Sequence, residues 1–224
     1  MRTAHSQLSA LRYPLDRAMA TKGNVRVLRE LIRYENLSAP KLVEVTELAN
    51  GTVREALSVL TKLRLVEAIG HGRAVLYRFN KAHPFGKFIL DLFTAEGHRM
   101  GSILQILREA GEELGDAVKS VWVYGSVARR EDDLDSDMDI AVVAEPSDMK
   151  MVTEYFTHIL EKGSEELYFT AEPVFIDTDD LQKLIEIGDP WWLSASKDAI
   201  AVYGARPNEL LSEFRVRTKS RGPR

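Results

Sequence analysis

The sequence predicts an α/β (α+β) protein with two domains and a helix between them. Helical periodicity followed by a hairpin pattern fills residues 1–83, and short strands alternate with helices over residues 115–214. Charge separates the same parts: residues 1–83 hold 14 Lys and Arg against 7 Asp and Glu, whereas residues 84–224 hold 16 against 27. A basic part suits a polyanion, and an acidic part suits bound metal. We expect a linking helix over 84–114 and a basic tail over 215–224.

The composition excludes several classes of protein. The chain has 224 residues, and its 45% hydrophobic content is ordinary for a globular protein. It contains no cysteine, which excludes disulfides and thiolate zinc sites. The sequence has no apolar run of about 18 residues, the length that suggests a membrane span. The first 20 residues lack the apolar core of a signal peptide. We therefore expect a soluble, cytoplasmic protein without membrane contact.

Helices followed by a hairpin are expected in the first domain. Apolar residues recur at helical spacing in three segments, and Pro40 suits the first turn of the second segment. Two short alternating runs flank a turn that contains two glycines, which predicts a β-hairpin with a basic tip. The expected elements are a short helix within 1–23, helices over 24–36, 39–48 and 53–66, and hairpin strands over 66–69 and 74–79.

This order of elements resembles the winged helix-turn-helix family of DNA-binding domains over about residues 22–82. The resemblance implies that the helix near 51–62 is a recognition helix. The residues expected to contact DNA or RNA are Thr52, Arg54 and Ser58 on that helix and Arg73 at the wing tip, which would enter a minor groove. Glu55 weakens this face, so a winged helix used for protein contact or dimerisation is the alternative.

The second half of the chain is expected to alternate strands with helices. Pro84 suits the start of the linking helix, in which Gly97 and Gly101 are candidate bends. Pro173 lies in an expected strand and marks it as an edge or irregular one, because proline cannot donate a ladder hydrogen bond. The expected elements are a helix over 85–114, a strand over 121–124, a helical turn over 127–130, a strand over 137–143, a helix over 147–162, a strand over 172–176, helices over 181–187 and 191–197, and a short strand or turn over 200–203.

Two carboxylates follow a Gly-Ser turn in the middle of this half. Asp137 and Asp139 are two residues apart at the start of a strand, so both project from one face while Met138 and Ile140 point into a core. Paired carboxylates repel each other, and hard oxygen ligands favour Mg²⁺ or Mn²⁺. Gly125 permits a close backbone approach to a ligand. The alternative is a Gly-Ser turn followed by a solvated acidic loop.

The segment GSVARREDDLDSDMDI, residues 125–140, resembles the signature of the nucleotidyltransferase superfamily that includes DNA polymerase beta, particularly its minimal members. The resemblance implies transfer of a nucleoside monophosphate from an NTP, ATP by default, to an acceptor hydroxyl. Asp137 and Asp139 would bind two metal ions. Gly125 and Ser126, at the start of a helix with free N–H groups, would contact phosphates. Arg129 would neutralise charge on the triphosphate or on the pyrophosphate that leaves.

A third carboxylate is usual in this superfamily, on a strand after the intervening helix. Glu172 matches that position, with a role as general base for the acceptor hydroxyl or as third ligand of the second metal. Asp177 is the competitor, although an N-cap of the next helix explains it adequately. Pro173 departs from the apolar residue that is common after this carboxylate.

Three hypotheses of function remain open at this point. In the first, the chain is an active nucleotidyltransferase with a protein or tRNA acceptor, targeted or regulated by its DNA-binding domain. In the second, it is a transcriptional regulator that only senses nucleotide. In the third, both domains serve the autoregulation of a toxin–antitoxin operon. A homodimer is compatible with all three, because winged-helix proteins often dimerise.

Overall fold

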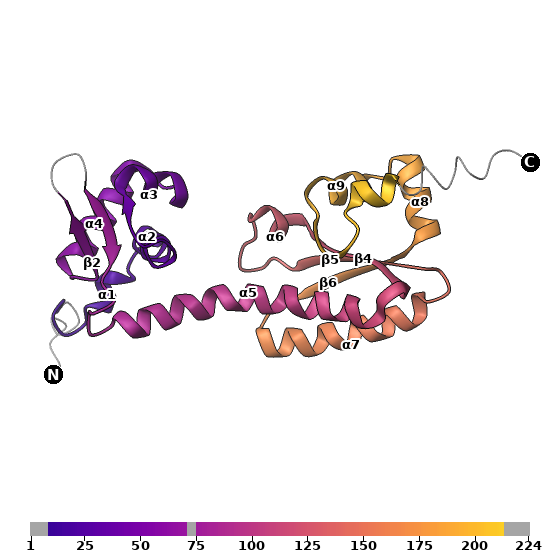
Figure 1. Cartoon of the computed structure of the whole chain (residues 1–224), viewed down its shortest axis with the longest axis horizontal. Helices are drawn as coiled ribbons and strands as arrows, with labels where there is room; N and C mark the ends of the chain where they lie inside the picture. The colour runs from indigo at the N-terminus through magenta and orange to yellow at the C-terminus, as the bar shows by residue number, and fades with distance from the viewer. Residues whose placement is uncertain (1–8, 71–74, 213–224) are drawn as a thin grey trace, which may run out of the picture. The chain divides into compact units, whose positions relative to one another are not determined.

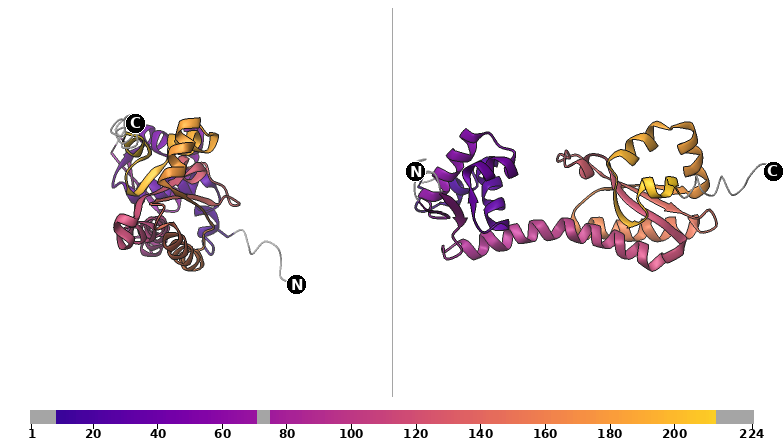
Figure 2. Two further views of the ribbon diagram at one scale, coloured as in Figure 1. Left: turned by 90° about the vertical axis from the view of Figure 1, so that its right-hand side faces the viewer. Right: turned by 45° about the horizontal axis from the view of Figure 1, so that its top comes forward.

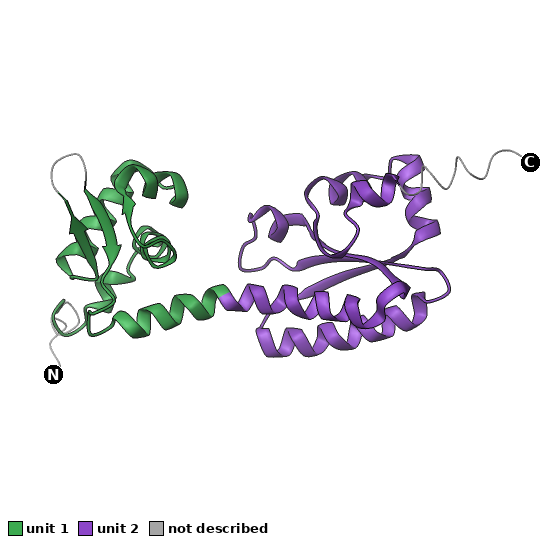
Figure 3. Ribbon diagram, viewed as in Figure 1, with its two compact units in different colours: residues 1–97 green, residues 98–224 purple. Residues whose placement is uncertain are grey.

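The computed structural model describes residues 9–70 and 75–212 of the chain. The fold is mixed α/β, as the sequence predicts. It divides into two compact units, residues 1–97 and residues 98–224 (Figure 3). The division falls within one long helix, α5 (Gly86–Leu114), which passes both Gly97 and Gly101 without interruption.

Unit 1 has the order of helices and strands expected of a winged helix. Its sheet is antiparallel with the strand order β1-β3-β2, and the two longer strands form the expected hairpin. No local pattern indicated β1, which pairs with β3 through Leu37 and Tyr77. The elements are α1 (Leu15–Ala18), α2 (Lys22–Arg33), β1 (Leu37–Ser38), α3 (Ala39–Thr46), α4 (Asn50–Lys62), β2 (Val66–Ile69), β3 (Leu76–Phe79) and the first part of α5 (Figure 1).

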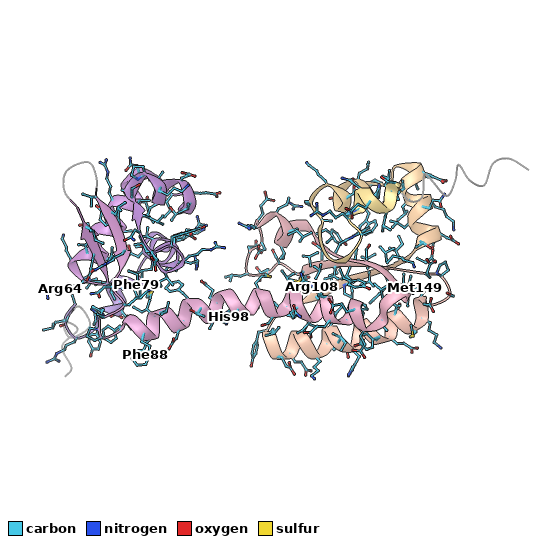
Figure 4. All side chains as sticks on the ribbon, in the orientation of Figure 1. Arg64, Phe79, Phe88, His98, Arg108 and Met149 are labelled. Atoms are coloured by element: carbon cyan, nitrogen blue, oxygen red, sulfur yellow. The ribbon has the colours of Figure 1, made fainter. Side chains whose placement is uncertain are left out.

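The helices of unit 1 begin where side chains can cap them. The Thr21 hydroxyl accepts a hydrogen bond from the Asn24 amide at the start of α2, and Ser38 does the same for Lys41 in α3. The beginning of α5 belongs to this unit, because Phe93 packs into its core with Phe79, whereas Phe88 on the same helix is exposed (Figure 4).

Unit 2 is built around a four-stranded sheet with the order β6-β5-β4-β7. The central pair β4 and β5 is antiparallel, β7 joins β4 antiparallel, and β6 joins β5 in parallel. Pro173 lies in β6 at the edge of the sheet, as predicted. The elements after α5 are η2 (Gly115–Ala117), β4 (Val118–Tyr124), α6 (Gly125–Arg129), β5 (Met138–Ala144), α7 (Met149–Leu167), β6 (Ala171–Asp177), α8 (Thr178–Ile187), α9 (Pro190–Asp198) and β7 (Ile200–Gly204).

Helices cover both faces of this sheet (Figure 2). Alternate strand residues such as Val123 and Ile140 pack with the second part of α5 and with α7. The residues between them, such as Trp122 and Ala141, pack with α8 and α9. Arg108 further fixes α5 to this unit by donating to the Val202 carbonyl, at 3.3 Å (Figure 4). The sheet therefore separates two apolar clusters.

Most differences from the predicted elements are extensions. Helix α7 continues past Lys162 to Leu167, and Arg99 donates hydrogen bonds to the carbonyls of Leu167 and Tyr168 at its end. Helix α6 begins at Gly125 and not at Ser126. Among the helices of the described residues, none has the length and apolar content needed to cross a membrane.

Candidate functional site

The candidate site lies where β4 ends and α6 begins. Gly125 has a φ angle of 72°, a conformation that glycine adopts readily and other residues rarely do. A Cβ atom at this position would overlap the carboxylate of Asp139. The turn therefore needs glycine for two independent reasons: its backbone conformation and its close approach to a charged side chain.

Three neighbouring strands place polar side chains next to one another, at paired positions across the sheet. Asp139 of β5 is paired with Tyr124 of β4 on one side and with Glu172 of β6 on the other. Residues paired in this way project from the same face of a sheet. Asp139 is half-buried and Glu172 is exposed. The sheet thus places the two carboxylates side by side, although 33 positions separate them in the sequence.

Asp137 precedes β5 and is exposed. Met138 between the two aspartates is buried, with 4% of its surface exposed, and its amide donates to the Thr170 carbonyl at 2.8 Å. Ile140 is fully buried, so both apolar residues face the core as predicted. Because Met138 and Ile140 are buried on one face of the sheet, Asp139 between them must project from the other face.

The surroundings of Asp139 raise the pKa of its carboxyl group. Burial raises the pKa of its carboxyl group, and the negative charge of Glu172 raises it further. The charges of Asp137 and Asp198 act in the same direction, whereas Arg129 opposes them. Each neighbouring carboxylate therefore makes the ionised form of Asp139 harder to maintain, and a cation would relieve that repulsion.

An aromatic pair lies beside these carboxylates. The Trp191 indole N–H donates to the Tyr124 hydroxyl at 3.0 Å, and the two rings meet edge to face at 5.9 Å. Burial raises the pKa of Tyr124, the hydrogen bond from Trp191 opposes this, and the charges of Asp139 and Glu172 raise it again. Tyr124 is therefore a neutral hydroxyl within the electrostatic field of the carboxylate pair.

Arg129, at the end of α6, is held by two carboxylates. Its Nε donates to Glu131 at 2.7 Å, and its Nη1 donates to Asp198 at 2.5 Å. The other oxygen of Asp198 accepts from the Gly125 amide at 3.4 Å. These contacts raise the pKa of Arg129, first through Glu131 and then through Asp198, so the guanidinium stays charged.

No motif in the sequence indicated Asp198 as part of the site. The residue lies at the C-terminal end of α9, 73 positions after Gly125. One signal could have found it. The C-terminal end of a helix is electrostatically unfavourable for a negative charge, so an aspartate there suggests a partner elsewhere in the fold.

The competitor for the third carboxylate lies at the other end of β6. Asp177 is paired with Ala144 rather than with Asp139. Its side chain accepts from the Asp180 amide at 2.7 Å and caps α8. Asp177 therefore has the structural role that the sequence suggested, and Glu172 is the carboxylate next to Asp139.

The described residues contain no group of three or more His, Cys, Asp or Glu side chains with a geometry that would hold a metal ion. The carboxylates at the site therefore have to be considered as one or two ligands. This number suits Mg²⁺, which usually binds one or two carboxylates, several waters and the phosphates of a substrate. Asp137 and Asp139 fit such a partial ligand set.

In unit 1, the residues expected on the recognition helix face solvent. Thr52, Arg54 and Ser58 are exposed on α4, and so is Glu55. The opposite face of α4 is anchored in the core by Val53, Ala56, Leu57 and Leu60. Arg73, expected at the wing tip, lies outside the described residues, as does the tail from 215 to 224.

Comparisons with known proteins identify both domains. Residues 105–183 match the family model described as polymerase beta, nucleotidyltransferase. Residues 24–71 match the model described as the RNA polymerase III subunit RPC82 helix-turn-helix domain. These matches confirm that the chain combines a nucleotidyltransferase domain with a helix-turn-helix domain. No curated protein matches the chain in a sequence comparison.

Several solved structures resemble parts of the chain. The AntR antimony-specific transcriptional repressor is 20% identical, with 45% of this chain and 86% of that chain covered and a TM-score of 0.35. A MarR family transcriptional regulator from Silicibacter pomeroyi is 17% identical, with 46% and 75% covered and a TM-score of 0.33. A toxin–antitoxin structure with AMP-PNP is 12% identical, with 53% and 91% covered and a TM-score of 0.32.

Proposed function

We propose that unit 2 is a metal-dependent nucleotidyltransferase that transfers a nucleoside monophosphate from an NTP to a hydroxyl of a protein or RNA. We further propose that the helix-turn-helix domain binds DNA and targets or regulates this activity. The match to the nucleotidyltransferase family supports the reaction class. The observation that carries the proposal is the Gly125 turn, which leaves no room for a Cβ beside the Asp139 carboxylate.

The triphosphate would be bound by the turn and by Arg129. Gly125 and Ser126 have no large side chain to keep phosphate oxygens away from the backbone. The guanidinium of Arg129 has five N–H donors, and its bonds to Glu131 and Asp198 use two of them. The remaining donors suit phosphate oxygens, and the fixed charge would stabilise the leaving pyrophosphate. ATP remains the default donor, because the base is not specified by these contacts.

Asp137 and Asp139 would hold Mg²⁺ or Mn²⁺, with Glu172 as a further ligand if a second ion binds. The mutual repulsion that raises the pKa of Asp139 supports this assignment, because a cation offsets it. When bound, the metal would neutralise phosphate charge and lower the pKa of the acceptor hydroxyl. Met138 and Ile140 keep the two aspartates on the phosphate side by burying their own side chains.

Glu172 would act as the general base. Its carboxylate is exposed, so the hydroxyl of a macromolecular acceptor can approach it. The hydroxyl proton would pass to Glu172 while the acceptor oxygen forms a bond to the α-phosphorus. The bond from the α-phosphorus to the bridging oxygen would break, and pyrophosphate would leave against Arg129. Alignment of these groups by one turn and three strands would lower the entropic part of the barrier.

Label transfer from the four α-labelled NTPs tests this proposal directly. The full chain is incubated with Mg²⁺ or Mn²⁺, cell lysate and total tRNA, and pyrophosphate release is followed in parallel. We expect label on a protein or RNA band. The double variant Asp137→Ala/Asp139→Ala should lose it, whereas Asp132→Ala/Asp135→Ala, two exposed acids of the same loop, should keep it. No transfer with any NTP and either metal would contradict the enzymatic proposal.

A nucleotide-sensing transcriptional regulator is the second candidate. It is favoured by the match of residues 24–71 to a helix-turn-helix domain and by the exposed Thr52, Arg54 and Ser58 on α4. In that case both domains would serve regulation, including autoregulation of a toxin–antitoxin operon. NTP would then change the affinity for DNA without release of pyrophosphate. Arg54→Ala should weaken binding to duplex DNA and reduce its salt dependence by about one counterion.

A further inference from the structure

We infer that Asp198 is a positioning residue for nucleotide binding. Its carboxylate joins the Gly125 turn to the Arg129 guanidinium and so arranges both before the triphosphate arrives. This inference rests on the proposed function, because Gly125 and Arg129 are the groups proposed to bind phosphate. It adds a residue from α9 to a site otherwise built from β4, α6, β5 and β6.

The contacts of Asp198 reach both ends of α6. One carboxylate oxygen accepts from the Gly125 amide at 3.4 Å, and the other accepts from Arg129 Nη1 at 2.5 Å. The Asp198 side chain is 15% exposed, whereas that of Glu131, the other partner of Arg129, is 66% exposed. An ion pair that is shielded from water is held more firmly than one in solvent. Glu131 has the larger effect on the pKa of Arg129, but Asp198 is the partner that is better shielded from water and that also contacts Gly125.

Helix α9 provides a fixed base for this carboxylate. Asp189 caps the start of α9 by accepting from the Trp191 amide at 2.8 Å. Trp192 and Ala195 are buried, and the Trp192 ring packs beside Trp122 of β4 with centroids 6.2 Å apart. Helix α6, by contrast, has five residues, none of them fully buried, and only Val127 packs partly against the core. The contacts of Asp198 at both ends of α6 therefore add to the few that orient this helix.

The end of α9 does not need this carboxylate for its own stability. The backbone already closes the end of α9, because the Ala199 amide donates to the Ala195 carbonyl. A negative charge at the C-terminal end of a helix is unfavourable unless a cation compensates it. Arg129 supplies that cation. The benefit of the pair is therefore expected at Arg129, whose long side chain would otherwise have to be ordered by the ligand itself.

Equilibrium binding of a non-hydrolysable ATP analogue to the full chain with Mg²⁺ tests the inference. Asp198→Asn should weaken binding about tenfold, as expected for loss of a charged hydrogen bond. Glu131→Gln should weaken it by a smaller factor, because that partner is more exposed. In an Arg129→Lys background, Asp198→Asn should have little further effect, since residues that act as a unit are not additive.

Two further measurements separate positioning from general damage. Thermal unfolding of Asp198→Asn should stay close to that of the wild type, and Asp198→Glu should recover part of the affinity. If Asp198→Asn does not fold, the comparison of Asp198→Glu with the wild type in both Arg129 backgrounds replaces it. In turnover assays, the KM for NTP should rise while the dependence on acceptor concentration stays unchanged.

Two results with Asp198→Asn would contradict the inference. Unchanged affinity in Asp198→Asn would overturn the inference, and tighter binding would show that Asp198 competes with phosphate for Arg129. Both results leave the proposed function intact, because the wild type still binds NTP. Absence of NTP binding by the wild type would overturn the proposed function and this inference together.

Discussion

The two faces of the sheet in unit 2 share one backbone and face different surroundings. On one face, Val121, Val123 and Ile140 pack under α5 and α7, and the contacts are apolar along the strands. On the other face, Trp122 and Ala141 are covered by α8 and α9. At the end where β5 begins, however, this second face carries the carboxylates of Asp139 and Glu172. Burial on the first face supplies stability, and incomplete cover on the second leaves charged groups available for chemistry.

This comparison shows how adjacent residues can have opposite roles. Asp139 and Ile140 are neighbours in β5, yet Ile140 is fully buried and Asp139 is not. Successive side chains of a strand point to opposite faces of the sheet, so neighbouring residues of β5 face different surroundings. Substitutions on the two faces should therefore separate activity from stability.

The largest expected effect is on activity and comes from the polar face. Asp139→Ala should reduce label transfer by about 10³-fold or more, as is typical when a group that stabilises charge in the transition state is lost. The free energy of unfolding should not fall, because the variant removes a carboxylate that is repelled by its neighbours. Transfer assays together with chemical denaturation measure both. A stability loss that matches the activity loss would contradict the division between faces.

The largest expected effect on stability comes from Ile140, the neighbour of Asp139 in β5. Ile140→Ala should lower the free energy of unfolding by about 2–5 kcal/mol, since it leaves a cavity in a fully buried position. Affinity for NTP, measured well below the unfolding temperature, should remain close to that of the wild type. Denaturant titration and equilibrium binding provide the check. Normal stability in this variant would show that the apolar face is not closely packed.

An intermediate effect is expected where the two roles meet, at Gly125. Gly125→Ala should destabilise the chain by ~1–3 kcal/mol through backbone strain and should also weaken NTP binding, because the new methyl group meets the Asp139 carboxylate. Gly115→Ala is a matched control. Gly115 also has a positive φ angle, of 53°, but a Cβ there meets nothing within 4 Å. Equal binding losses in both variants would argue against a specific contact with Asp139.

The smallest effect is expected in the pH dependence of stability. The pKa of Asp139 is raised in the folded state, so the folded chain binds its proton more readily than the unfolded chain does. Its contribution to stability therefore falls as pH rises through the window between the ordinary and the raised pKa, and stays low above it. Asp139→Asn should be more stable than the wild type at neutral pH, with a smaller difference in acid. Unfolding measured across pH, with and without Mg²⁺, tests this: added Mg²⁺ should stabilise the wild type more than the variant.

Much of the fold could be predicted from local patterns. The helical period of α2 and α4 and the continuous apolar runs of β4 and β5 indicate which side chains are buried, because burial favours apolar residues. Two short features were not predictable in this way. Strand β1 has two residues, too few for an alternation, and exists because Leu37 pairs with Tyr77 of β3. Strand β7 was expected as a strand or turn, and its pairing with β4 decides the outcome.

The sequence by itself determined the two domains, the Gly-Ser turn and the pair Asp137 and Asp139, because these depend on residues close together in the chain. Only the tertiary structure decided which distant groups join them. Parallel pairing of β5 with β6 brings Glu172 next to Asp139 and leaves Asp177 at the far end of the strand. Packing of α9 on the sheet brings Asp198 to Arg129. The reason is physical: periodicity reports which face of an element is buried, whereas register and packing between elements depend on contacts that no local pattern contains.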